Sequence, residues 1–152
     1  MIPHPDFAGG PLPRDAVLGA FRLRVLGRAD LTEDYAAVIS STHVLMGLFP
    51  GDWPNGLTKE DNALDLAWHE KEIDLCRSFA WVIRDSARGY IGCCYLFPAP
   101  GQQGWANAVF WMRDAPDRQE RTATFDPLFR SWLTSVAPDG LKISHSNNGY
   151  LG

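Results

Sequence analysis

The sequence lacks the long apolar run that a membrane-spanning helix requires. Its uninterrupted apolar stretches are only a few residues long, whereas a helix needs about 20 apolar residues to cross a bilayer. The first residues also lack the charged segment followed by an apolar segment that marks a secretory signal peptide. We therefore expect a cytoplasmic protein that has no membrane partner.

Basic runs and paired-cysteine motifs are absent as well. The 14 Lys and Arg residues are outnumbered by 18 Asp and Glu residues, giving a formal net charge of -4. Nucleic-acid binding depends on clustered positive charge, so nucleic acid is not an expected partner. The cysteines Cys76, Cys93 and Cys94 match neither zinc-site spacing nor a C-x-x-C motif. We expect buried free thiols, a reducing compartment and no bound metal.

The composition favours one folded domain. Of the 152 residues, 45% are hydrophobic and 21% are charged, which differs from the polar mixture typical of disordered chains. Residues 1–13 contain four prolines and two glycines, and both residue types interrupt regular hydrogen bonding. We predict an extended arm over residues 1–20 and a single domain over residues 21–152.

Hydrophobic periodicity predicts a definite order of strands and helices. The predicted elements are a strand at 21–26, helices at 30–47 and 58–76, strands at 79–84, 90–97 and 105–112, a helix through 125–136 and a strand at 141–145. A helix between two strands favours a parallel, right-handed crossover. The fold class is therefore α/β (α+β), with a mixed, mainly antiparallel sheet of five or more strands and about three flanking helices.

This element order resembles that of the GNAT N-acetyltransferase superfamily. The likeness covers residues 21–145, and the segments LTKEDNALDLAWHEKE, YIGCCYLFP and ANAVFWMR are similar to a set of uncharacterised bacterial GNAT proteins. The resemblance implies an enzyme that transfers an acyl group from acyl-CoA, usually acetyl-CoA, to an amine on a small molecule or peptide.

In that superfamily the fourth strand leads to a Q/R-x-x-G-x-G/A loop, whose amides hold the CoA pyrophosphate. Here Arg121 stands where the pattern has glycine. A glycine has no side chain and would let the backbone come closest to the phosphates. Three interpretations stay open. In the first, Arg121 pairs with the phosphates, helped by Arg113 and Arg118. In the second, its side chain fills the cofactor slot, and the domain is a non-catalytic binding module. In the third, Arg121 belongs to a solvated helix start and pairs with Asp117 and Glu120.

The resemblance also assigns a cofactor-binding role to the fourth strand, whose main chain would bind pantetheine as an added edge. The implied cofactor-binding residues are Ala108, Val109, Phe110, Trp111, Met112, Arg113, Arg118, Arg121, Thr122 and Ala123.

Candidate catalytic groups lie on the helix at 58–76 and near the C-terminus. Asp61, Asp65, His69 and Glu72 share one helix face. They could recognise a cationic amine, with His69 or Glu72 as the proton acceptor, or could form an ordinary hydrated face. Tyr150 follows the last strand, where the superfamily often places a general acid, although a tyrosine so near the terminus is also prone to fraying.

Large aromatic residues give two further expectations. Phe49 and Trp53 in the loop at 47–57 either lie over the acceptor side of the sheet or cap the core. Trp105 and Trp111 lie near an open sheet edge that a second copy could cover. The chain is therefore expected to be a monomer or a homodimer.

Overall fold

A six-stranded sheet forms the centre of the protein, seen in a computed structural model that describes residues 2–87 and 89–145. The strands are β1 (Asp15–Leu18), β2 (Phe21–Val25), β3 (Phe79–Asp85), β4 (Gly89–Pro98), β5 (Trp105–Met112) and β6 (Lys142–His145). They lie side by side in sequence order. β1 to β5 are antiparallel neighbours, and β6 pairs with β5 in parallel. The predicted fold class is confirmed.

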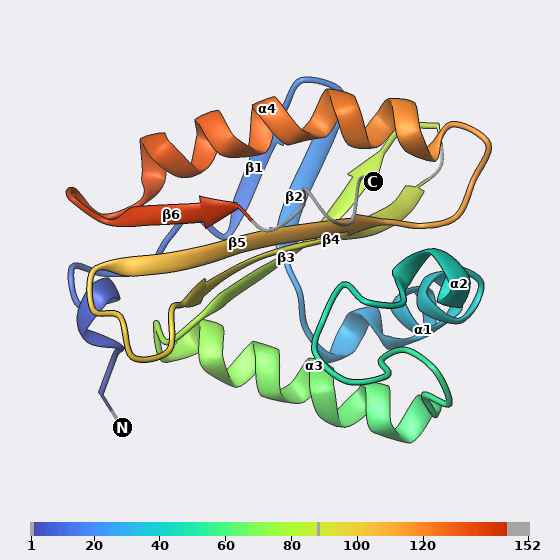
Figure 1. The fold of residues 1–152 in the computed structure, drawn as a ribbon, viewed down its shortest axis with the longest axis horizontal. Helices are drawn as coiled ribbons and strands as arrows, with labels where there is room; N and C mark the ends of the chain where they lie inside the picture. Colours follow the sequence, from blue (N-terminus) through green and yellow to red (C-terminus); the bar gives the residue numbers. More distant parts are fainter. Residues whose placement is uncertain (1, 88, 146–152) are drawn as a thin grey trace.

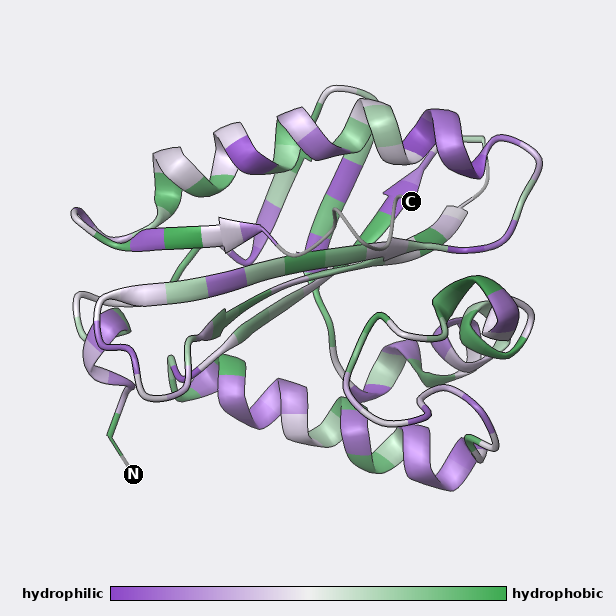
Figure 2. Cartoon of the chain, viewed as in Figure 1, coloured by the Kyte–Doolittle hydropathy of each residue, from purple (hydrophilic) through white to green (hydrophobic). Residues whose placement is uncertain are grey.

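Helices cover both faces of this sheet (Figure 1). α1 (Leu31–Ile39), α2 (Thr42–Leu45) and α3 (Lys59–Asp74) lie on one face, and α4 (Arg118–Val136) lies on the other. Figure 2 shows hydrophobic residues concentrated in the sheet and hydrophilic ones on the outer sides of α3 and α4. In the described parts of the chain, no helix has the length and apolar character needed to cross a bilayer.

The helix boundaries follow from capping and from one long-range contact. Thr58 caps α3, because its hydroxyl accepts a hydrogen bond of 3.1 Å from the main-chain N–H of Asp61. The single helix predicted at 30–47 is wrong: it is divided into α1 and α2 at Ser40 and Ser41. The Ser41 hydroxyl accepts a hydrogen bond of 2.8 Å from the N–H of Asp114, so a tertiary contact holds Ser41 at the break.

The N-terminal segment is not the extended arm that its prolines predicted. Pro5–Phe7 forms a 3₁₀ helix, η1, and Asp15–Leu18 is the first strand of the sheet. The Phe7 ring is fully buried and packs edge-on against Phe79, with centroids 5.1 Å apart. Burial of apolar side chains between the prolines and glycines therefore anchors this segment to the core.

A close approach between β4 and β5 fixes the centre of the sheet. The β3–β4 register shifts so that Ile83 pairs with Gly92 and Arg84 pairs with Tyr90, which leaves Ile91 as the extra residue of a β-bulge. A Cβ atom at Gly92 would lie 1.9 Å from the carbonyl oxygen of Trp111. Glycine is therefore required here for β4 to pack against β5.

Replacing this glycine tests the close approach directly. Gly92→Ala should lower the free energy of unfolding by about 2 kcal/mol or more, because β4 and β5 must move apart to admit the methyl group. Gly9→Ala is the matched control, since a Cβ there meets no atom within 4 Å. Urea denaturation measures both variants, and equal losses of stability would contradict the assignment.

Candidate functional site

An aromatic pocket lies on the sheet face that α3 covers. Its volume is about 370 Å³, and its lining comes from the α2–α3 loop (Phe49, Trp53, Leu57), from α3 (Asp65, Trp68, His69) and from β4 (Tyr95, Phe97). The ring of Phe49 contacts both Trp53 and Tyr95, with centroids 5.2 Å and 5.5 Å away. The loop aromatics thus line this pocket, and both are also packed against the hydrophobic core, as the second sequence interpretation expected.

His69 is a buried titratable residue of this pocket. Only 7% of the residue is exposed, and its Nδ1 has no hydrogen-bond partner among the described residues. Its Nε2 lies 3.5 Å from Oδ2 of Asp65. A proton on Nε2 would point to Asp65 and would leave the lone pair of Nδ1 without a donor among the described residues.

Tyr95 connects the pocket to β5. Its hydroxyl accepts a hydrogen bond of 2.9 Å from Nε1 of Trp111, and Tyr95 stands opposite Val109 in the β4–β5 ladder. Burial raises the pKa of Tyr95 well above its usual value of 10, so the hydroxyl stays protonated and can donate a hydrogen bond. The sequence analysis missed Tyr95 because this residue lies in an apolar strand with no local motif. Its spacing of two residues from Phe97, which puts both side chains on one face of the strand, could have indicated it.

The other predicted catalytic residues do not line the aromatic pocket. Glu72 is buried, but its carboxylate is paired with Arg77 (Nε to Oε2, 3.0 Å) and with Lys71 (3.4 Å). Asp61 borders a separate depression beside the loop at 50–57. Tyr150 lies outside the described residues. Of the predicted acidic face, the pocket therefore brings together Asp65 and His69.

The predicted cofactor strand is paired on both sides over only part of its length. Trp105–Ala108 of β5 pair with Lys142–His145 of β6. Over Val109–Met112, the ladder partner within residues 2–87 and 89–145 is β4. These four residues are buried, and the main chain then runs through Arg113 to the start of α4.

Arg121 is held by two carboxylates at the start of α4. It forms ion pairs with Asp85 of β3 and with Asp117, whose Oδ2 lies 2.7 Å from Nε. The Arg121 side chain is only 16% exposed. Of the interpretations left open by the sequence, pairing with Asp117 is confirmed, and pairing with Asp85 was not foreseen because the two residues are far apart in the chain.

Three other residues of the predicted cofactor loop bond to main-chain carbonyls. Arg113 donates to the carbonyl of Tyr90 at 3.3 Å, and Nε of Arg118 donates to the carbonyl of Met112 at 3.1 Å. Thr122 is buried and its hydroxyl donates to the carbonyl of Arg118, while Ala123 is exposed. The start of α4 thus carries guanidinium groups that main-chain carbonyls anchor.

Comparison with known proteins identifies the fold. No protein-family model matches this sequence, and no curated protein matches it. A coenzyme A complex of RimL, a ribosomal L7/L12 alpha-N-protein acetyltransferase, is similar with a TM-score of 0.65 at 12% identity, over 78% of this chain and 67% of that chain. A GCN5-related N-acetyltransferase from Brucella melitensis has a TM-score of 0.59 at 18% identity, over 84% and 59%. The chain has the GNAT fold.

A further GNAT-fold relative has even lower identity. The acetyl transferase from Salmonella typhimurium that modifies the N-terminal serine of L7/L12 has a TM-score of 0.62 at 7% identity, over 87% of this chain and 76% of that chain. Such low identity establishes shared architecture, because a fold can host unrelated functions. Within this GNAT fold, function has to be argued from the side chains described above.

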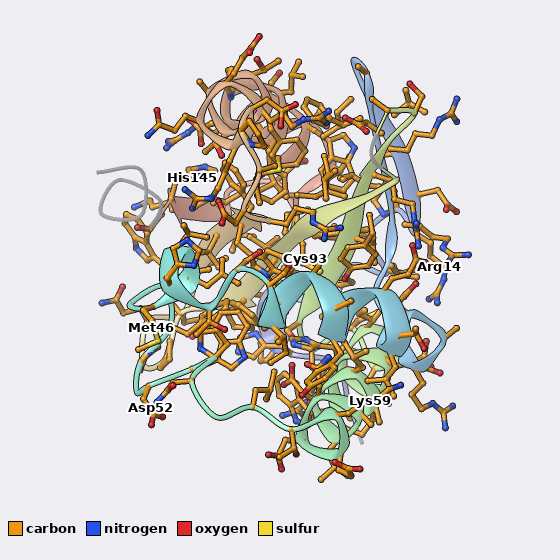
Figure 3. All side chains as sticks on the ribbon, turned by 90° about the vertical axis from the view of Figure 1, so that its right-hand side faces the viewer. Arg14, Met46, Asp52, Lys59, Cys93 and His145 are labelled. Atoms are coloured by element: carbon orange, nitrogen blue, oxygen red, sulfur yellow. The ribbon has the colours of Figure 1, made fainter. Side chains whose placement is uncertain are left out.

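A buried polar cluster lies between α1 and the sheet, outside the aromatic pocket. Asp34 of α1 accepts hydrogen bonds from the Tyr90 hydroxyl and, at 2.9 Å, from Nδ2 of Asn62. Cys93 lies 3.1 Å from the Tyr90 hydroxyl and occupies the middle of the molecule, beside α1 (Figure 3). Burial raises the pKa of Asp34 above its ordinary value, against the opposing effect of these hydrogen bonds. The predicted burial is confirmed for the free thiols Cys93 and Cys94, whereas Cys76 is partly exposed.

The raised pKa of Asp34 predicts a pH-dependent stability. As pH rises above the ordinary pKa of 3.8, the unfolded chain loses this proton before the folded chain does, so the contribution of Asp34 to stability falls. The stability of the wild type relative to Asp34→Asn should therefore decrease from about pH 4 to about pH 7. Urea denaturation across this range measures the difference, and a constant or increasing value would contradict the shift.

Proposed function

We propose that this chain is an acyl-CoA-dependent N-acyltransferase that acetylates an amine. The observation that carries the proposal is His69. It is a buried imidazole whose Nδ1 has no hydrogen-bond partner among residues 2–87 and 89–145, and it lies in a pocket whose wall residue Tyr95 is hydrogen-bonded to β5. Support comes from the GNAT fold and from RimL, a structural neighbour that is a protein acetyltransferase and is in complex with coenzyme A.

In this proposal, main-chain N–H groups and guanidinium groups that follow β5 hold the phosphates of acyl-CoA. The first N–H groups of a helix have no intrahelical partner and attract phosphate, and Gln119 and Glu120 in the first turn of α4 are exposed. Arg113 and Arg118, anchored by carbonyl groups, add positive charge there. Residues 109–112 would bind the pantetheine arm through their main chain, whereas Ala108, also predicted for this role, is already paired with His145 of β6 and Leu96 of β4. Thr122 and Ala123 lie in the helix that follows.

Arg121 has an indirect role in this proposal. Its guanidinium is paired with Asp117 and Asp85, so it contributes by neutralising a carboxylate that would repel phosphate at this end of α4. The glycine of the GNAT pattern lets the backbone come close to the phosphates, whereas Arg121 in this chain offsets the negative charge of Asp117 and Asp85.

Proton transfer is assigned to the pocket residues. A bound acyl-CoA would supply the thioester whose carbonyl carbon the amine attacks, with the C–S bond breaking and the thiol leaving. Before attack the ammonium must lose a proton, and Nδ1 of His69 accepts it, while Asp65 beside Nε2 stabilises the imidazolium. The nitrogen bonds to the carbonyl carbon as the C–S bond breaks. The Tyr95 hydroxyl gives its proton to the leaving sulfur, and the proton that the acylated nitrogen loses returns to the Tyr95 oxygen. Glu72 is the alternative base and Tyr150 the alternative acid.

Titration with acetyl-CoA tests the cofactor assignment. Calorimetry should show micromolar binding that Arg113→Glu weakens about tenfold or more, because a positive charge at the phosphate end is reversed. Arg22→Glu on the exposed side of β2 is the control for net charge and should leave the affinity unchanged. If millimolar acetyl-CoA produces no heat, the domain is a non-catalytic binding module instead.

Two glutamine variants discriminate between the candidate bases. With an amine acceptor and saturating acetyl-CoA, His69→Gln should lower kcat about 100-fold or more, without changing acetyl-CoA affinity. Glu72→Gln should lower kcat far less, because Arg77 and Lys71 already hold that carboxylate. The reverse order of effects would assign the base to Glu72.

A further inference from the structure

We infer that the acceptor is a small primary amine that enters the aromatic pocket as its ammonium, with a compact aromatic or branched hydrocarbon group filling the interior. This inference rests on the proposed function, because it names the acceptor class for the same site. The walls of the pocket, its charge and its size support this acceptor class.

The walls are suited to a hydrocarbon group that carries a positive charge. Phe49 packs edge-on against Trp53 and Tyr95, and Tyr95 stacks with Phe97 at 5.5 Å. Aromatic faces attract cations through the negative potential of the ring. The same rings gain free energy when a hydrocarbon group displaces water from them. A neutral polar ligand would be attracted less strongly to the ring faces and would bury less hydrocarbon surface against them.

The charge of the lining selects a cation over an anion. Asp65 is the carboxylate of the pocket, with its side chain 55% exposed, and none of the described lining residues is Lys or Arg. His69 and Tyr95 are, by contrast, more than nine-tenths buried. An ammonium would therefore sit toward Asp65 and His69, with its hydrocarbon group against the buried rings. An amino acid would bring a carboxylate that no cation in this lining balances.

The size of the pocket favours a small molecule. Its volume of about 370 Å³ is near the lower end of the roughly 300 to 1,000 Å³ that ligand pockets span. This space suits one ring or one branched side chain, whereas a protein tail needs an extended groove. The acceptor class thus differs from the ribosomal-protein amine named for the Salmonella typhimurium relative.

The test compares two probes that are nearly the same shape, 2-phenylethylamine and 2-phenylethanol. Calorimetric titration at about pH 7 should show the amine binding about tenfold more tightly than the alcohol, as expected for one cation–π contact plus a carboxylate. Asp65→Asn should remove this preference and leave alcohol binding unchanged. Asp61→Asn is the matched control, because Asp61 lies on the same helix but borders the neighbouring depression.

Three results would overturn the inference: equal affinity for amine and alcohol, equal effects of Asp65→Asn and Asp61→Asn, or binding of a Ser-Ala-Ala tripeptide in preference to the amine. Each is separate from the acetyl-CoA titration. If acetyl-CoA binds and the amine does not, the acceptor class is wrong and the transferase proposal stands. If the amine binds with the predicted selectivity and acetyl-CoA does not, the pocket is an amine site in a protein that is not a transferase.

Discussion

The register of β4 on β5 is the constraint on which the rest of this structure depends. It places Phe110 against Phe125 of α4 on one face of the sheet, and Tyr95 and Trp111, joined by a hydrogen bond, on the other. Because side chains alternate along a strand, a slip of one residue would turn the aromatic wall of the pocket toward α4. The absent side chain of Gly92 permits the close strand approach that holds this register.

The two ends of β5 have different chemical surroundings. Near its start the strand is paired on both sides, while after its end the chain enters a region of alternating arginines and aspartates at the start of α4. Within that region Arg121 balances Asp85 and Asp117. The GNAT fold is therefore kept although a charged ion-pair network occupies the position of the pattern's glycine, and any phosphate there depends on main-chain amides and on Arg113 and Arg118.

The sequence predicted those elements whose signals are local. Alternating residues predicted β2, the cap at Thr58 predicted the start of α3, and the helix between β5 and β6 predicted the parallel pairing of these two strands. The edge strand β1 was missed. The burial of Phe7 and the break at Ser41 were missed, because each depends on a partner that is distant in the chain. The site was predicted in part for the same reason: His69 stood out on a helix face, whereas Tyr95 acquires its meaning only once β4 is packed against α3.

The central proposal is that the end of β5 and the start of α4 bind acyl-CoA. Two-dimensional amide NMR of the labelled protein during acetyl-CoA titration tests it most directly. The account predicts saturable shifts of the main-chain amides of residues 109–113 and 118–120, together with shifts of residues lining the pocket near Tyr95. Saturable shifts confined to other surfaces, or no shifts at millimolar acetyl-CoA, would contradict it.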